Sequence, residues 1–310
     1  MAEKRGCFKT GCLGCLGVLG VGLLFLVILA GVAWNGARDK EVVDRELSAP
    51  TEVAQLDAPD VVSGEAREAL ASPKGGRLVL NLNQGEFELH RGAPGQELTI
   101  KANFDDDIYN LEDKFETLPD STWVYQVRFY RTIGGMQALL RQVFGGGHNN
   151  SIHVYLPPDV PIELVIDSEE GGFEADLGGL WLTSADISFA KGGFALEISE
   201  PLHEPVDSFV IRSRMGGFDA QGLGNASPHR LVVESRMGGA QVDLSGQWLN
   251  DCTAQMSIRM GGMAVVLPDG INILGVATDG SDLTRTDQEL GLPTLSLSLT
   301  QSMGEIDVVR

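Results

Sequence analysis

Three arginines recur in the sequence in the same local setting. Arg214, Arg236 and Arg259 each stand immediately before Met-Gly-Gly. If the strands that carry them stack about 4.8 Å apart, these arginines form an outward column of like charges. Like charges that lie opposite one another repel, so the column needs carboxylates or an anionic ligand between its members. We favour ion pairs with the acidic surface, and a candidate anion-binding or polyanion-binding column is the alternative.

Other reactive residue types are not arranged for catalysis. The sequence has no G-x-S-x-G elbow, no H-E-x-x-H motif and no Walker loop. The run Asp105-Asp106-Asp107 lacks the alternating ligands of a calcium loop and is typical of a solvated turn. We therefore expect no catalytic residues, no cofactor-binding residues and no metal site, and we predict that the chain is not an enzyme.

The histidines and cysteines support the same expectation. The histidines are scattered without metal-ligand spacing, at His90, His148, His153, His203 and His229. Of these, His148 and His153 are the nearest to a metal-binding pair. Cys252 is the only cysteine outside the amino-terminal trio Cys7, Cys12 and Cys15, so we expect it to be a small buried apolar residue. The trio is interpreted as small packing residues, with palmitate acceptors as the alternative.

Overall charge excludes one class of partner. The chain has 310 residues and a net charge of −20, with a pI near 4.5. A surface with this excess repels phosphate backbones over about a Debye length, so nucleic acid is a poor candidate partner. Hydrophobic residues make up 43% of the sequence, which is enough to build a core. The 39 glycines follow no period of three, which indicates many tight turns rather than a fibre.

An uncharged apolar run predicts a membrane anchor at the amino-terminal end. Residues 11–34 carry no charge and are long enough to cross a hydrocarbon core of about 30 Å as a helix. Lys4, Arg5 and Lys9 precede the run, which predicts that residues 1–10 are cytoplasmic. A cleaved signal peptide is the competing interpretation, although its apolar region is usually shorter. Both interpretations place the rest of the chain across the membrane.

After the predicted anchor the sequence changes character twice. Residues 35–73 are polar and acidic with scattered prolines, so we expect a juxtamembrane linker. Residues 74–310 are expected to form one extracytoplasmic domain, because alternating apolar and polar residues in it predict strands. Early examples are 77–82, 86–89, 98–102 and 123–130. Residues 134–144 are expected to form a short amphipathic helix or a lid-like insertion.

From Gly171 onward a glycine-paired repeat predicts the fold. The pairs are Gly171-Gly172, Gly192-Gly193, Gly216-Gly217, Gly238-Gly239 and Gly261-Gly262, and they recur every 21 to 24 residues. A period of this size is typical of stacked units that bury their apolar faces against their neighbours. We therefore predict an all-β, solenoid-like stack whose corners are these glycines. Gly304 lies 43 residues after Gly261, which we interpret as two periods with a corner near Asp279-Gly280.

The side-chain alternation predicts which residues face the core. Before the glycines, we expect three sets of inward residues: Phe209, Ile211, Ser213 and Met215; Leu231, Val233, Ser235 and Met237; and Ala254, Met256, Ile258 and Met260. After the glycines, we expect Phe173, Ala175 and Leu177, and likewise Ala240, Val242 and Leu244, to point inward. One repeat therefore reads as strand, corner, strand, corner.

Several of these segments resemble a known family. The stretch 151–194, with its Leu-Pro-Pro-Asp turn and Asp-Leu-Gly-Gly-Leu corner, and the later SRMGGAQVDLSG and IRMGGMAVVLPDGINI, resemble the LiaF-like, toast-rack and putative-adhesin group of bacterial envelope proteins. The likeness covers roughly residues 75–310. It implies a non-enzymatic β-solenoid domain, and some members of the group are accessory regulators of envelope stress signalling.

Two hypotheses of function follow. The first is a cell-envelope interaction module, anchored in the cytoplasmic membrane, that binds a membrane protein or a cell-wall polymer and regulates envelope stress signalling. The second is an adhesin or structural surface protein without a signalling role. An extended, rigid stack suits either task.

Overall fold

The computed structural model describes residues 42–49, 75–133, 150–277 and 290–309 of the chain. These residues form strands, turns and loops, with one short 3₁₀ helix, η1 (Leu223–Ala226). The expected all-β class is therefore confirmed. Among the described residues, no helix is long and apolar enough to cross a membrane. The expected span at 11–34 and the expected helix at 134–144 lie outside the described ranges.

The strands differ in length, and the longest contain the glycine pairs. In chain order they are β1 (Val42–Ala49), β2 (Gly76–Arg91), β3 (Leu98–Asp105), β4 (Tyr109–Thr117), β5 (Trp123–Arg131), β6 (Ser151–Leu156), β7 (Ile162–Asp176), β8 (Leu182–Glu197), β9 (Ser208–Gln221), β10 (Arg230–Ser235), β11 (Gly238–Asp243), β12 (Cys252–Val266), β13 (Asn272–Ala277) and β14 (Thr294–Val309). The four strands expected early in the domain are confirmed within β2, β3 and β5.

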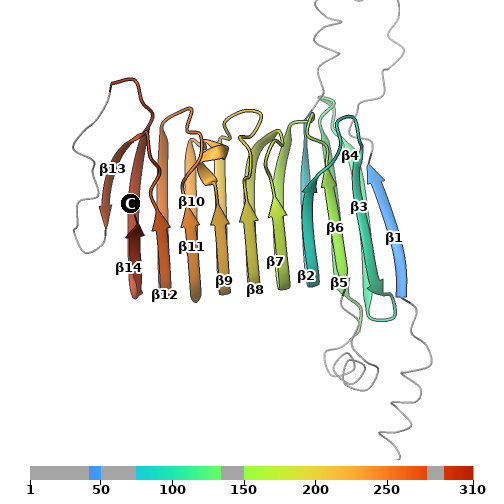
Figure 1. Cartoon of the computed structure of the whole chain (residues 1–310). Coiled ribbons are helices and arrows are strands. Elements are labelled where there is room, and N and C mark those ends of the chain that lie inside the picture. Colours follow the sequence, from blue (N-terminus) through green and yellow to red (C-terminus); the bar gives the residue numbers. More distant parts are fainter. Residues whose placement is uncertain (1–41, 50–74, 134–149, 278–289, 310) are drawn as a thin grey trace, which may run out of the picture.

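All the strands join one hydrogen-bonded sheet (Figure 1). Its order is β1-β3-β6-β2-β7-β8-β9-β10-β12-β14-β13, with β11 lying between β9 and β12. From β6 to β13 the neighbours along this path are parallel. At the other end, β1, β3 and β6 pair antiparallel, and so do β4 and β5.

The long strands bend sharply at their glycine pairs. In β8 the rings of Phe189 and Phe194, on opposite sides of the bend, stack with centroids 4.0 Å apart. Five residues of straight strand would separate these positions by about 16 Å. Residues 177–181 alone lead from the end of β7 to β8, whose start pairs with the start of β7. So short a connection can join parallel neighbours only because the bend returns the strand's end towards its beginning.

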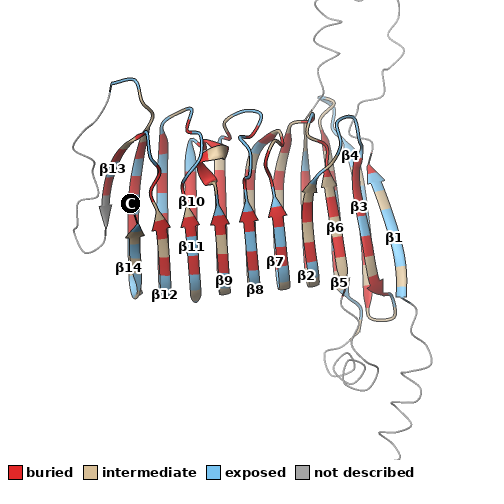
Figure 2. Ribbon diagram, in the orientation of Figure 1, coloured by how far each residue is buried: buried red, intermediate tan, exposed pale blue. Residues whose placement is uncertain are grey.

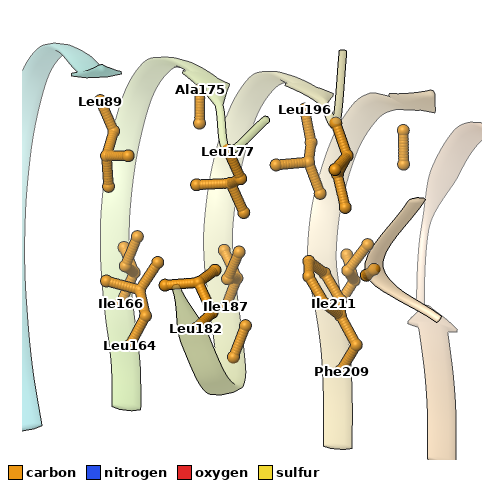
Figure 3. Packing of buried hydrophobic residues seen from close by; sticks show 14 of the residues in the cluster. Leu89, Leu164, Ile166, Ala175, Leu177, Leu182, Ile187, Leu196, Phe209 and Ile211 are labelled. Carbon is orange, nitrogen blue, oxygen red and sulfur yellow. The ribbon is translucent and has the colours of Figure 1, made fainter. Parts of the chain in front are cut away.

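The bends divide the sheet into two halves that enclose the core. Before the glycines, Ile166 pairs with Ile187, and Ile187 pairs with Ile211. After them, Ala175 pairs with Leu196. Figure 3 shows side chains of both halves filling the space between them. Equivalent residues of successive strands therefore lie in rows, and the rows build one continuous apolar interior.

Alternating burial along the strands confirms most of the predicted inward residues. Buried residues alternate with more exposed ones along most of the strands, and the buried positions line up across neighbours (Figure 2). The inward residues expected after the glycines are all buried: Phe173, Ala175, Leu177, Ala240, Val242 and Leu244. Those expected before the glycines are also buried, except for the residue next to each glycine pair.

The methionines at that position correct the prediction. Met215, Met237 and Met260 were expected in the interior, but they are 49%, 43% and 40% exposed. The period of two holds only while a strand is straight. At the bend the chain changes direction, so the arginine and the methionine that follow one another both face solvent.

The glycine pairs lie at the bends, and their two members differ. The first glycine has a positive φ in every pair: Gly171 (132°), Gly192 (125°), Gly216 (129°), Gly238 (135°) and Gly261 (122°). The second glycine, in contrast, has open space or only ordinary contact where a side chain would be: Gly172, Gly193, Gly217, Gly239 and Gly262. The row of first glycines continues to Gly85 of β2 and Gly304 of β14.

The last interval of the repeat is a second correction. Gly304 lies directly opposite Gly261, because β14 pairs with β12. The expectation of two periods between these glycines is therefore wrong. The extra chain includes β13, which, within the described residues, pairs with the first half of β14 on the side away from β12. The Asp279-Gly280 corner lies outside the described residues.

The first described strand corrects the expected linker. Residues 42–49 of the segment 35–73 form β1, which pairs antiparallel with β3. Ala49 is buried and Leu47 packs against the core, so burial of apolar surface explains why this segment joins the sheet. At the same end, β2 pairs with both halves of β7, which joins the early strands to the repeats.

Candidate functional site

Arg214, Arg236 and Arg259, which we call the arginine column, lie in one row across β9, the β10–β11 bend and β12. Before the row, Ser213 pairs with Ser235, and Ser235 pairs with Ile258. After the row, Gly238 pairs with Gly261. All three side chains are exposed on the outside of the bend. Neighbouring strands in a sheet are about 4.8 Å apart, so the column presents three closely spaced cations.

Two carboxylates on the same outer face are already engaged by a different arginine. Nη1 of Arg212 lies 2.5 Å from Oδ1 of Asp186, and its Nε lies 3.9 Å from Oε2 of Glu234. Asp186 and Glu234 belong to the strands on either side of β9. Both carboxylates therefore pair with Arg212, and neither forms an ion pair with the arginine column.

No ion pair within the described residues includes a member of the arginine column. The ion pairs that we favoured from the sequence are thus not formed there. Glu169 lies in the same row, but it is two strands from Arg214, or about 10 Å. Positive charges that lack close counter-charges repel one another along the row. A bound anion would relieve this repulsion.

Exposed methionines lie directly beside the arginine column. Met215, Met237, Met260 and Met303, the methionine ridge, follow one another along the bend, and Met303 is 63% exposed. Methionine side chains are flexible and polarizable, so they adapt to apolar groups of varied shape. The outside of the bend thus combines a row of cations with a row of apolar groups. This arrangement can hold a polymer that repeats anionic groups along its length.

A cluster that the sequence reasoning missed lies on the outer face of β2 and β6. Glu88, His90 and His153, the histidine cluster, bring one ligand atom each to within 4.8 Å of one another. Oε2 of Glu88 is 3.0 Å from Nε2 of His90 and 3.0 Å from Nδ1 of His153. Glu88 pairs with His153 across the strands. The spacing of Glu88 and His90 was visible in the sequence, but the pairing of β2 with β6 was not.

The pair of His148 and His153 considered from the sequence is not tested, because His148 lies outside the described residues. His153 itself contacts Glu88 and His90. The remaining histidines lie elsewhere: His203 stacks on Trp181, and His229 lies near Asn250.

Cys252 and Asp105, which were also singled out from the sequence, lie in a buried position and in a turn, respectively. Cys252 is buried, as predicted, and burial raises the pKa of its thiol to about 12, opposed by a backbone hydrogen bond from Leu231. A thiol with this pKa stays protonated and is a poor nucleophile. Asp105 begins a turn in which its Oδ1 accepts a hydrogen bond from the amide of Asp107.

A small polar cleft of about 250 Å³ lies where β2, β5 and β7 meet. Asn83 donates a hydrogen bond to Glu169 at its margin, and Arg128 lies over the ring of Tyr130. Its volume is below the range of about 300–1,000 Å³ that is usual for small-molecule sites. The arginine column is therefore the stronger candidate for ligand binding.

Comparisons with known proteins give structural neighbours but no family. No protein-family model matches the sequence, and no curated protein matches it. The structure is similar to a "putative cell adhesion protein" of Clostridium sporogenes, with a TM-score of 0.40 and 11% identity over 86% of this chain and 99% of that one. It is also similar to a "putative adhesin" of Bacteroides fragilis, with a TM-score of 0.32 and 11% identity over 87% and 98%.

A third neighbour has a different name. It is a "putative lipid binding protein" of Parabacteroides distasonis, with a TM-score of 0.23 and 9% identity over 87% of this chain and 97% of that chain. All three neighbours are bacterial. At these similarities the function must be argued from the side chains of this chain itself.

Proposed function

We propose that this protein is an adhesin-like surface protein of the cell envelope that binds an anionic glycopolymer along its arginine column. The observation that carries the proposal is that Arg214, Arg236 and Arg259 lie in register without a carboxylate partner among the described residues. In a chain of net charge −20, an uncompensated row of cations is an exception that a ligand would explain.

The geometry favours a polymer over a single small anion. Cations repeat along the stack with the strand spacing of about 4.8 Å, so successive anionic groups of an extended chain can each meet one guanidinium. The methionine ridge runs parallel to the arginine column, so it can contact the apolar faces of the bound polymer. The rest of the acidic surface repels a polyanion, which confines binding to this row.

The proposal includes a location and an architecture. Residues 11–34 anchor the protein in the cytoplasmic membrane as a single-pass helix, with residues 1–10 inside and the domain outside. The bent parallel strands then form a two-faced β-solenoid that presents the arginine column away from its own core. The in-register rows and the stacked rings of Phe189 and Phe194 support this architecture. The proposed role is binding without catalysis.

A regulatory role in envelope stress signalling is the second candidate, implied by the resemblance to the LiaF-like group. The arginine column offers a surface for a wall polymer, so an adhesin-like role is the proposal that we put first. Crosslinking in living cells separates the two. Capture of a sensor kinase would favour regulation, and capture of wall polymer alone would favour adhesion.

Binding to a defined polyanion tests the proposal. We expect the full chain to bind a polyglucuronate polysaccharide, measured by isothermal titration calorimetry, and to bind a neutral polysaccharide of equal length much more weakly. Affinity should fall steeply with added salt. Arg236→Ala should weaken binding about tenfold, because it removes a charge-assisted hydrogen bond.

Arg77→Ala is the matched control, because Arg77 is an exposed arginine that already pairs with Glu163 on a distant part of the same half. Its affinity should equal that of the parent. Equal affinities for Arg236→Ala and the parent, or binding that ignores salt, would reject the arginine column as the site.

A further inference from the structure

We propose that the histidine cluster, Glu88, His90 and His153, is a binding site for a divalent transition-metal ion, and that zinc fits it best. Two imidazoles and one carboxylate are a ligand set that zinc uses in proteins. The site is separate from the arginine column, so it neither requires nor supports polyanion binding.

The distances already approach those of a coordinated ion. Ligand atoms about 2.0–2.1 Å from zinc at the tetrahedral angle lie about 3.3 Å apart. In the cluster, Oε2 of Glu88 is 3.0 Å from a nitrogen of each histidine. All three ligand atoms lie within 4.8 Å of one another. Small side-chain rotations are therefore enough to place one ion among them.

The backbone holds the three side chains in place. Glu88 and His90 are two residues apart on β2, so both side chains lie on its outer face. Glu88 also pairs with His153 of β6. The residues that flank them on the two strands are buried in the core and hold both strands in place: Phe87, Leu89, Ile152 and Val154. The rings of His90 and His153 are nearly parallel, with an interplanar angle of 15° and centroids 6.2 Å apart. A rigid support of this kind reduces the cost of ordering the ligands when an ion binds.

Charge around the cluster also favours a cation. Lys101 lies opposite His153 on β3, but its Nζ is 3.9 Å from Oε1 of Glu46, which offsets its charge. On the other side, Glu174 of β7 lies opposite Glu88, and Asp176 is near in register to His90. The carboxylates around the site therefore exceed the basic groups.

Binding of a zinc ion requires a free lone pair on one ring nitrogen of each histidine. Without an ion, Nε2 of His90 and Nδ1 of His153 share hydrogen bonds with the Glu88 carboxylate. With zinc, each of these nitrogens presents its lone pair to the ion, and the ring proton of each neutral imidazole resides on its other nitrogen. Three protein ligands leave a fourth position for water.

Zinc titration of the full chain tests the site. Cys7, Cys12 and Cys15 should be replaced by serine in every variant, because thiolates also bind zinc. We expect one zinc ion per chain by calorimetry, and we expect the ring resonances of His90 and His153 to shift in histidine-selective NMR spectra. His153→Ala and His90→Ala should each weaken zinc binding at least tenfold.

Two further variants keep the test decisive. Glu88→Gln keeps the size of the side chain and its hydrogen-bonding capacity but removes its charge, so it should weaken zinc binding without unfolding the strands. His203→Ala removes a histidine that stacks on Trp181, and it should bind zinc like the parent. Equal zinc affinity and stoichiometry in the parent, Glu88→Gln and His153→Ala would overturn the proposal.

Discussion

The carbonyl oxygen of Gly216 occupies the space in which a side chain on Gly238 would begin. The two residues belong to adjacent bends of the stack, and Gly238 has a φ of 135°, a region that is open essentially to glycine alone. The bends can therefore stack at strand spacing only if the first position of each pair has no side chain. Gly239, one residue later, has nothing within 4 Å of where its side chain would start.

These neighbours predict opposite responses to the same substitution. Gly238→Ala should lower the free energy of unfolding by about 3 kcal/mol or more, because it adds a backbone clash to an unfavourable φ. Gly239→Ala should change it by less than about 1 kcal/mol, because its space is open. Urea unfolding followed by circular dichroism measures both. Equal losses in the two variants would show that the bends do not pack as described.

Two methionines show how a position in the interior differs from a position at the bend. Met256 is buried and Met237 is exposed, although both fall on the face that alternation assigns to the core. Met256→Ala should cost about 2–5 kcal/mol of stability by creating a cavity. Met237→Ala should cost no more than about 0.5 kcal/mol, because it removes a solvent-facing side chain. Thermal melting curves compare the two, and a similar drop in melting temperature for both would place Met237 in the core instead.

The carboxylate of Asp176 should make stability depend on pH. Burial alone would raise its pKa, but hydrogen bonds from the Gly178 amide and from the amide and hydroxyl of Ser199 outweigh burial, so its pKa lies below the usual value. Because the folded pKa is lower than the unfolded one, this group stabilises the fold above about pH 4. The stabilisation is lost as pH falls through the folded pKa.

Asp176→Asn should therefore be less stable than the parent at pH 7 by about 1 kcal/mol or less, since the side chain is exposed. The difference should shrink as the pH falls from about 5 towards 2. Urea unfolding at several pH values measures the trend, and a constant difference across this range would contradict it.

The thiol of Cys252 should not react with alkylating agents in the folded protein. Its buried thiol has a pKa raised to about 12, so almost no thiolate is present at pH 8. We expect iodoacetamide to leave the Cys252 peptide unmodified in native protein and to alkylate it fully in urea, as measured by mass spectrometry. Rapid alkylation in the native state would mean that β12 opens readily.

Much of the fold was visible in the sequence because it depends on local periodicity. The spacing of the glycine pairs located the bends, and the alternation of residues such as Phe173 and Ala175 located the inward face. The same alternation misplaced Met215 and Met237, because a period of two says nothing about the residue at which the strand turns. The interval before Gly304 misled for a related reason: chain length does not reveal which strand pairs with which.

The sequence by itself determined the β class, the repeat, the buried character of Cys252 and the row in which the three arginines lie, since each follows from residue type and spacing along the chain. Only the tertiary structure decided which charges meet. Asp186 and Glu234 pair with Arg212 and not with the arginine column, and Glu88 meets His153 across more than sixty residues of chain. Such pairings depend on strand order and register, which side-chain alternation within one strand does not encode.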